Sequence, residues 1–435
     1  MLESANEESN FVRFLRWTEK YTKVDMVYLA HGGLWLIGAQ VVTSLSSIAL
    51  AFAFAHLLTQ ESFGTYEYLL TLFGIVTVTT LRGMDSIVVQ ALSRGNEGTL
   101  WEGLYAKMRW GLLGSLASLG ISGYYFLQGN TIIALGLLFA AIFTPLMDAV
   151  GIFGSVLSAK KDFALDSKLS AFNQTAAVLL LIATMFVTQN PLIVFAVYCG
   201  AWTMMRYLSL RITLNKYALN DKREPHALSY ARHSSLASAM GTLIAAVDGI
   251  VVYHYLGASA LAVYTFSMAP VLQARSFVNI LGTLAIPKYA SQTSAEIKRT
   301  LPQRTLLLLG IGLVLTLGYI VLAYPFFYIF FPRYLDAVLY SQVYSFTIAI
   351  NLGGMALGAA IDARTTLMPK KYIYIFNAPT IILALSSVLL VQWFGIWGAI
   401  TAQFLSNVVG LSVLLFTWFK IKDKDFPQHA NQKSV

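Results

Sequence analysis

Charged residues are scarce in this chain of 435 residues. Asp, Glu, Lys and Arg make up 12% of it and hydrophobic residues 57%, with a mean hydropathy of +0.64. A soluble domain carries roughly 25% charged residues. A soluble core of this length is therefore not expected, and the composition indicates a membrane protein.

Cysteine is almost absent, and so are several diagnostic motifs. The single cysteine, Cys199, excludes an internal disulfide framework and a multi-cysteine metal site. His31, His56 and His254 form no ligand cluster by spacing, so we expect no metal and no cofactor. No G-x-x-x-x-G-K-[ST] occurs, which excludes ATP binding by a P-loop. The start of the chain lacks the pattern of a cleavable signal, so we expect the first span to direct insertion.

Long apolar segments take up most of the chain. A helix needs about 20 residues to cross the hydrocarbon core of a bilayer. The pattern predicts an all-α polytopic membrane protein with about 12 transmembrane helices, because segments of this kind occur at residues 32–55, 65–81, 110–127, 131–158, 169–188, 191–212, 235–255, 261–286, 305–331, 337–361, 372–393 and 396–419.

The basic residues fall on one side of these spans. All but two of the 30 Lys and Arg residues lie at the ends of spans that face the same side, the exceptions being Arg275 within a span and Arg333 in an opposite loop. By the positive-inside rule this side is cytoplasmic, so both termini are expected there. The sequence pI of about 9.4 therefore reflects membrane topology. Because the charges form no basic face, we expect no nucleic-acid partner.

The chain contains a weak internal repeat. Residues 55–66, leaving the first span, align without gaps on residues 253–264, leaving the seventh, and the alignment pairs His56 with His254 and Tyr66 with Tyr264. Parallel repeats of six spans are related by an axis along the membrane normal, with the substrate site at their interface. The organisation predicted is an amphipathic N-terminal segment, a six-helix bundle, a cytoplasmic linker, a second six-helix bundle and a basic tail, at 1–31, 32–212, 213–234, 235–419 and 420–435.

Several turns resemble those of Wzx-type polysaccharide and oligosaccharide flippases, which belong to the multidrug, oligosaccharidyl-lipid and polysaccharide (MOP) exporter superfamily. Residues 56–66 (HLLTQESFGTY) resemble the family's R-x-L-x-P-x-x-F-G-x-Y turn, with His56 for Arg and Gln60 for Pro. Residues 248–257, 285–288, 331–337 and 394–402 resemble later motifs in the same order.

This resemblance implies two six-helix bundles forming a V around a cavity that opens alternately to each side of a bacterial inner membrane. The implied cargo is an oligosaccharide on polyprenyl pyrophosphate, moved without ATP and coupled to an H⁺ or Na⁺ gradient. Membrane lipids and polysaccharide polymerase or assembly proteins are the implied partners. The protein is then not an enzyme, and its pathway is cell-surface polysaccharide assembly.

An ionisable side chain within a span costs about 2.5–3.5 kcal/mol on insertion scales and usually faces a cavity or a partner. Arg275 is such a residue, with Gln273 nearby and Asn279 on the same helical face at spacing i, i+4. A guanidinium binds phosphate oxygens in bidentate fashion, so we expect Arg275 to contact the headgroup. The alternative is a structural ion pair with Asp248 or Asp148.

The intramembrane acids are candidates for ion coupling. Asp248 and Asp148 are placed to bind H⁺ or Na⁺, and Asp148 is also placed to line the cavity. The alternative for Asp248 is a salt bridge or a turn at the end of its span. Polar residues within spans suit sugar hydroxyls, although helix-to-helix hydrogen bonding is their more frequent role. The candidates of this kind are Gln40, Asn173 and Asn351.

Two pairs at the cytoplasmic ends of spans form a candidate inner gate, or else solvated span ends: Arg82 with Asp85, and Asp362 with Arg364. Three other functions fit the pattern less well. A small-molecule or multidrug cation antiporter of the same superfamily is the main alternative, and Asp148 keeps it open. A membrane polymerase would need a long external loop, which the pattern lacks, and a scaffold would not need Arg275.

Overall fold

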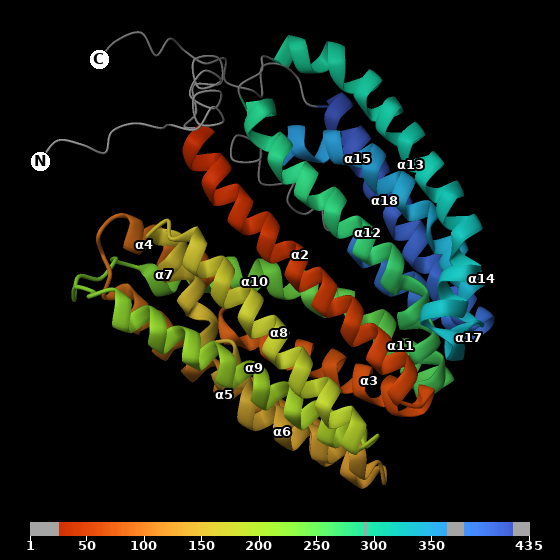
Figure 1. The fold of residues 1–435 in the computed structure, drawn as a ribbon, viewed down its shortest axis with the longest axis horizontal. Coiled ribbons are helices and arrows are strands. Elements are labelled where there is room, and N and C mark those ends of the chain that lie inside the picture. The colour runs from red at the N-terminus through yellow and green to blue at the C-terminus, as the bar shows by residue number, and fades with distance from the viewer. Residues whose placement is uncertain (1–25, 291–293, 363–377, 421–435) are drawn as a thin grey trace, which may run out of the picture. The chain divides into compact units, whose positions relative to one another are not determined.

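The computed structural model describes residues 26–290, 294–362 and 378–420, and within these ranges all regular elements are helices. Figure 1 shows their arrangement. Most of the expected N-terminal amphipathic segment, Arg364 and nearly all of the basic tail lie outside the described residues.

The predicted all-α membrane fold is confirmed, and each expected span coincides, over its described residues, with a helix or with helices separated by a short break; residues 372–377 of the eleventh span lie outside the described residues. In the described parts of the chain, eight helices are long and apolar enough to cross a membrane. A ninth span is formed if the segment Gln60–Thr80 and the helix Met84–Ser93, bent by 45°, are counted as one. A shorter apolar helix covers Ile381–Phe394.

The helices form two compact units. The described part of unit 1 comprises residues 26–51, 79–187 and 196–236. Its elements are most of α2 (Met26–Leu57), α4 (Met84–Ser93), α5 (Thr99–Leu127), α6 (Thr131–Met147), η2 (Val150–Ile152), α7 (Phe153–Ala159), α8 (Phe163–Val187), most of α9 (Pro191–Lys216) and the first half of α10 (Ala227–Ala245).

In unit 1, small residues let α5 and α6 pack closely. Ser118 and Ser122 of α5 donate hydrogen bonds to the carbonyl oxygens of Leu137 and Ala134 on α6, both at 2.7 Å. Small residues and interhelical hydrogen bonds are typical of membrane helix interfaces, where no hydrophobic effect drives association.

Pro145 breaks the fourth span and explains a third hydrogen bond between α5 and α6. A proline has no N–H to donate to the carbonyl four residues before it, so the oxygen of Ala141 loses its helical partner. The Ser115 hydroxyl donates to that oxygen at 2.6 Å instead. The helix ends two residues later, at Met147, and resumes as η2 and α7. Gly111 fits against Pro145, because a Cβ there would lie 2.6 Å from the proline Cα.

Unit 2 contains the other helices, including the second span. Its described part comprises residues 52–78, 188–195 and 237–420, with the gaps given above. Besides parts of α2, α9 and α10, it holds α3 (Gln60–Val76), the first half of η1 (Thr77–Thr80), α11 (Val247–Leu256), α12 (Ala258–Ala290), α13 (Ser294–Phe330), η3 (Pro332–Tyr334), α14 (Ala337–Tyr344), α15 (Phe346–Asp362), α17 (Ala378–Phe394) and α18 (Ile396–Lys420).

The two segments that align in sequence lead into α3 and α12, which pack together in unit 2. α3 begins at Gln60 and α12 at Ala258, the same spacing at which the sequence aligns with itself. Gly64 allows the close approach, because a Cβ there would lie 1.8 Å from the carbonyl oxygen of Ala258. Phe63 packs on Phe266 with ring centroids 4.9 Å apart.

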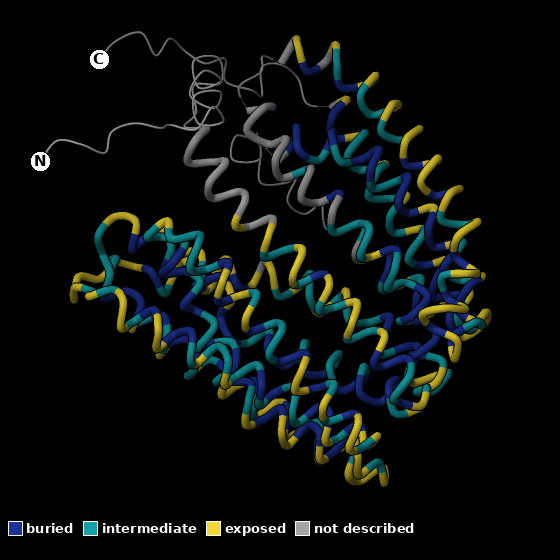
Figure 2. Tube along the Cα trace, in the orientation of Figure 1, coloured by how far each residue is buried: buried dark blue, intermediate teal, exposed yellow. Residues whose placement is uncertain are grey.

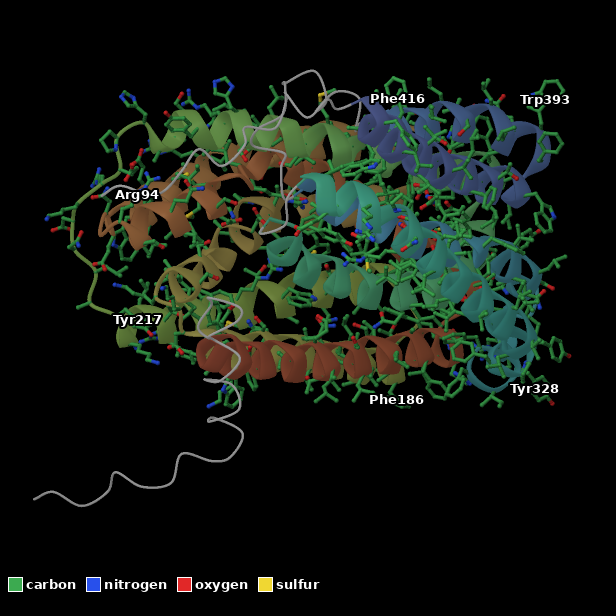
Figure 3. The ribbon with its side chains drawn as sticks, turned by 90° about the horizontal axis from the view of Figure 1, so that it is seen from above. Arg94, Phe186, Tyr217, Tyr328, Trp393 and Phe416 are labelled. Atoms are coloured by element: carbon green, nitrogen blue, oxygen red, sulfur yellow. The ribbon has the colours of Figure 1, made fainter. Side chains whose placement is uncertain are left out.

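Large apolar side chains lie on the outer faces of helices in both units. On α13, Leu306, Val314 and Val321 are 71%, 69% and 75% exposed, and exposed positions recur along this helix in Figure 2. Phe186 on α8 and Trp393 on α17 also point outward (Figure 3). Such faces suit the hydrocarbon of a bilayer.

The helices extend beyond the apolar segments at the ends predicted to be cytoplasmic. α5 begins at Thr99 and α13 at Ser294, whereas the predicted spans begin at 110 and 305. Residues 84–93, expected to be part of a loop, form α4. Hydropathy marks only the part of a helix that lies in hydrocarbon, so polar extensions escape it.

Candidate functional site

A connected set of polar side chains crosses the interior of unit 2, and Arg275 on α12 lies at one end of it. Its Nη1 donates to the Tyr344 hydroxyl and its Nη2 to Asn351 Oδ1, both at 3.1 Å. Asn351 Nδ2 in turn donates to Asn407 Oδ1 at 3.0 Å. The amide orientation of Asn351 is thus consistent, with its oxygen accepting and its nitrogen donating.

Asp248 on α11 lies at the other end. Its Oδ2 accepts hydrogen bonds from the Tyr264 hydroxyl at 2.6 Å and from Gln403 Nε2 at 2.7 Å. Its Oδ1 accepts from the backbone N–H of Gly249 at 2.8 Å. The side chain is buried, at 7% exposed. Asp248 is therefore well provided with hydrogen-bond donors but forms no ion pair with a described residue.

Helical spacing explains how the two ends are joined. Gln403 and Asn407 lie four residues apart on α18 and so share one face. Asn407 Nδ2 donates to the backbone oxygen of Gln403 at 2.7 Å. Asp248 lies in the first turn of α11, just after the break at which α10 ends, where free N–H groups and the helix dipole favour a carboxylate. We call this set, from Asp248 to Arg275, the unit 2 polar network.

A cavity of about 680 Å³ lies beside the network, in unit 2. Asn351, Asn407 and Ser406 supply polar groups to its wall, and several glycines supply bare backbone. Arg275 is hydrogen-bonded directly to Asn351, one of these wall residues. A cavity with few polar groups among apolar ones is the usual form of a small-molecule site.

A second cavity, of about 580 Å³, is lined by residues of α3, α10 and α11 in unit 2. Thr71 and Gly74 of α3 line it together with Asp248 and Gly249. The approach is close, because a Cβ on Gly249 would lie 3.3 Å from the Thr71 hydroxyl. We call this space the Asp248 cavity.

Unit 1 holds a buried charge cluster of its own. Lys107 on α5, whose side chain is 1% exposed, donates to both carboxylate oxygens of Asp85 at 2.8 Å and lies 3.2 Å from Asp148. The Thr80 hydroxyl donates to Asp148 Oδ2 at 2.6 Å. Asp148 is thus engaged within this cluster, and Asp85, expected to act with Arg82, pairs with Lys107.

The other predicted residues form hydrogen bonds within or between neighbouring helices, or have side chains that the structure does not describe. Asn173 accepts a hydrogen bond from Ser209 at 3.0 Å, which joins α8 to α9, and Gln40 donates to Ser44 at 3.3 Å within α2. Gln273, on α12, uses its backbone oxygen to accept from Ser276. The side chains of Asn279 and Asp362, and all of Arg364, are outside the described residues.

Three loops of unit 1 that the charge pattern assigns to the cytoplasm are joined to one another. Gly98 N donates to the oxygen of Lys222 at 2.8 Å, and Arg94 forms a 3.0 Å ion pair with Glu224, while Lys160 of the third loop forms an ion pair with Glu97. Figure 3 places Arg94 and Tyr217 at one end of the unit and Phe186 at the other. The shared end agrees with the predicted topology of these loops.

Hydrogen bonds in these loops lower the pKa values of two carboxyl groups. The Lys160 ammonium, followed by the backbone N–H of Asn220, holds the pKa of Glu97 below its usual value. Burial would raise the pKa of Asp162, but hydrogen bonds from Lys216 and Tyr217 outweigh it and lower that pKa. Both acids therefore stay ionised and hold the loops together at neutral pH.

Two ionisable residues within helices, Lys107 and Glu67, carry no sequence signal that points to a site. Lys107 was counted among the charges that set topology, since it lies near the end of a predicted span. Glu67 lies on α3 between Tyr66 and Tyr68, and it is distinguished only as an acid within a stretch that is otherwise aromatic and apolar. Among the described residues, no group of three or more His, Cys, Asp or Glu is placed to hold a metal ion.

No family model matches the chain, and no curated protein does either. Solved structures do match over nearly its whole length. A structure described as the lipid II flippase MurJ in an inward closed conformation has a TM-score of 0.70 at 16% identity, covering 90% of this chain and 89% of that one.

Two transporters of the MOP superfamily are also similar. An inward-facing multidrug resistance MATE family transporter has a TM-score of 0.60 at 12% identity, covering 89% of this chain and 96% of that one. A transporter from Pyrococcus furiosus, described as having a binding pocket of reverse polarity, has a TM-score of 0.57 at 13% identity, covering 95% and 99%. At these identities the likeness shows the fold, which is that of multi-pass membrane transporters.

Proposed function

We propose that this chain, which has the fold of the MOP-superfamily transporters, is a flippase for an oligosaccharide linked to polyprenyl pyrophosphate. It moves the headgroup across a bacterial inner membrane by alternating access, for cell-surface polysaccharide assembly. Support comes from the Wzx-like turns of the sequence and from the similarity to a lipid II flippase. The observation that carries the proposal is the environment of Arg275.

Arg275 is a permanent cation on an apolar helix, and its partners do not neutralise it. Its described hydrogen bonds go to a phenol and an amide, and no described carboxylate pairs with it. The alternative of an ion pair with Asp248 or Asp148 finds no support, because those acids bond to other groups. An unneutralised intramembrane charge points to a charged ligand. Pyrophosphate, with several anionic oxygens, matches the guanidinium fork.

Asp248 is the proposed coupling residue of the unit 2 polar network. A carboxylate beside a cavity can bind H⁺ or Na⁺. An ion bound at Asp248 changes the hydrogen bonds that Tyr264 and Gln403 donate to this carboxylate, and so changes the network. Oligosaccharide hydroxyls find donors and acceptors at Asn351, Asn407 and Ser406 in the adjacent 680 Å³ cavity. Asp148 is proposed to act through the Lys107 cluster.

The topology of the proposal follows the charge pattern. Both termini are placed in the cytoplasm, with six-helix bundles at 32–212 and 235–419 joined by the linker 213–234. Arg82 and Asp85, and Asp362 with Arg364, remain the proposed cytoplasmic gate. Polysaccharide polymerase or assembly proteins are the proposed partners, and no step uses ATP.

The test is transport in proteoliposomes. A fluorescent polyprenyl-pyrophosphate oligosaccharide is followed between leaflets for the wild type, Arg275→Ala, Arg275→Lys and the control Arg211→Ala, an exposed arginine on α9. Charge-assisted hydrogen bonds contribute about 1.5–3 kcal/mol, so Arg275→Ala is expected to slow movement about 10- to 100-fold. The lysine variant retains part of the rate. Normal movement by folded Arg275→Ala would reduce Arg275 to a structural role.

A small-molecule cation antiporter is the second candidate, favoured by the Asp248 cavity and by the MATE-like fold. A carboxylate at a cavity wall attracts an organic cation. If the wild type moves no lipid-linked oligosaccharide but exchanges ethidium for protons, and Asp248→Asn abolishes this exchange, the antiporter is the correct assignment.

A further inference from the structure

Glu67 is an intramembrane acid to which the polar network gives no role. It lies seven residues from the start of α3, about 10 Å along the helix axis at 1.5 Å per residue. Among the described residues, its carboxylate receives no hydrogen bond and forms no ion pair. An ionisable group within a span marks a functional site by default, because its charged form is costly there.

The position of Glu67 on α3 connects two features of unit 2. Phe63, Glu67, Thr71 and Gly74 follow one another at spacings of four, four and three residues, so they lie along one face of the helix. Thr71 and Gly74 line the Asp248 cavity. Phe63 lies against Tyr334 of η3, with ring centroids 6.4 Å apart. Glu67 is therefore one helical turn from the cavity and one turn from the packing around Tyr334.

Tyr334 carries an unusual phenol. Its side chain is fully buried, and its hydroxyl has no hydrogen-bond partner among the described residues. Buried tyrosine hydroxyls normally find a partner. Burial raises the pKa of this phenol, Arg333 opposes the effect, and the negative charge of Glu67 adds to it. Two polar groups without described partners thus lie within electrostatic reach of each other.

The other titratable groups on the elements around α3 are already engaged or lie at the helix ends. Tyr264 is bound to Asp248, and Tyr68 stacks on Tyr253 with centroids 3.6 Å apart. Arg333 donates to the oxygen of Leu58 at 2.8 Å. The full set of titratable or charged groups on α3, the α2 end, α11, η3 and the facing part of α12 is His56, Glu61, Tyr66, Glu67, Tyr68, Asp248, Tyr253, His254, Tyr255, Tyr264, Arg333 and Tyr334.

We propose that Glu67 is a proton-binding site that couples transport to a proton gradient, exchanging its proton with water by way of the Asp248 cavity, one helical turn along the same face of α3. The inference rests on the proposed transport function and adds a second carboxyl to its coupling machinery. One O–H bond forms when water delivers a proton to the carboxylate, and the same bond breaks when the acid returns it. Protonation removes the charge of this half-buried carboxyl group, so the two forms of Glu67 favour different environments for this face of α3.

Infrared spectroscopy of the lipid-reconstituted protein tests the site without any substrate. The wild type is expected to show a protonated-carboxyl band that disappears as the pH rises, and Glu67→Gln to lack it. Glu61→Gln is the matched control, because Glu61 is exposed in the first turn of the same helix. Glu67→Asp should keep a band with a shifted midpoint. Identical spectra for Glu67→Gln and the wild type across the pH range would overturn the proposal.

Transport then separates this proposal from the function on which it rests. In Glu67→Gln, a proton gradient is expected to leave the rate of oligosaccharide movement unchanged, a ratio of about one, while exchange without a gradient continues. Unchanged acceleration in this variant would overturn the coupling role and leave the flippase intact. A wild type that shows the titrating band but moves no oligosaccharide would support the proton site and refute the cargo.

Discussion

Replacing Lys107 with methionine removes the cation between Asp85 and Asp148 in unit 1. Removal of one partner from a buried ion pair costs about 3–5 kcal/mol, because the remaining charge is left without compensation. Asp85 keeps 40% of its side chain exposed and Asp148 21%, so water relieves part of this cost. We therefore expect a loss near the lower limit, about 3 kcal/mol. For a unit of this size, that corresponds to a melting temperature lower by about 6–12 °C.

The single cysteine provides an assay specific to this unit. Cys199 lies on the part of α9 that belongs to unit 1, and it is completely buried. A thiol-reactive dye in detergent therefore reports the unfolding of unit 1 as temperature rises. Because methionine is similar to lysine in length and fills its apolar stem, the variant isolates the loss of charge.

Two further variants decide whether the charge is responsible. Arg94→Met breaks an exposed ion pair in the same unit and should cost about 1 kcal/mol or less. Adding Asp85→Asn and Asp148→Asn to Lys107→Met removes the unpaired carboxylates and should restore most of the loss. The electrostatic reasoning would be refuted if Lys107→Met had the same melting temperature as the Arg94→Met control. It would also be refuted if the triple variant were less stable than Lys107→Met.

Three other predictions concern single residues. Gly64→Ala is expected to prevent the packing of α3 on α12 and to reduce the yield of folded protein in gel filtration at least several-fold, whereas Gly74→Ala, with open space around it, should not. Because the pKa of Glu97 is lowered in the folded state, its stabilising effect is complete above the ordinary glutamate pKa and is lost as pH falls through the folded-state value. Glu97→Gln should therefore reduce the loss of stability at acid pH, measured by circular dichroism. An unchanged loss of stability in this variant would contradict the prediction. A thiol introduced by Arg223→Cys, with Cys199 replaced by alanine, should react with an impermeant maleimide from the cytoplasmic side alone, and labelling in intact cells would invert the predicted topology.

The fold was predictable because its main signal is local. An apolar segment of sufficient length must form a helix in a bilayer, whatever packs against it. The bounds were less predictable, since α5 already begins at Thr99, where the sequence is not yet apolar enough for hydropathy to give a signal. The break at Pro145 was visible in the sequence, but the hydroxyl of Ser115 that satisfies the freed carbonyl was not.

The candidate site was predictable only where a residue is rare for its surroundings. Arg275 stood out as a cation within a span, but its partners Tyr344 and Asn351 are 69 and 76 residues away and come together only through packing. Lys107 was hidden because a lysine near a span end has an ordinary explanation in topology. Glu67 was hidden near the expected start of its span, where acids are common.

The unit 2 polar network links the two events that a coupled flippase must link. Asn351 accepts from Arg275 and donates to Asn407, which in turn contacts Gln403, a donor to Asp248. A guanidinium that turns to a pyrophosphate leaves the Asn351 oxygen without this donor, and an ion at Asp248 competes with the Gln403 amide. If each event alters the same chain of hydrogen bonds, the ion changes headgroup affinity by some factor. Thermodynamic linkage then requires the headgroup to change ion affinity by the same factor. Proton binding at Glu67, which bonds to none of these residues, should show no such reciprocity through Asn351, so replacing this asparagine distinguishes the two coupling sites.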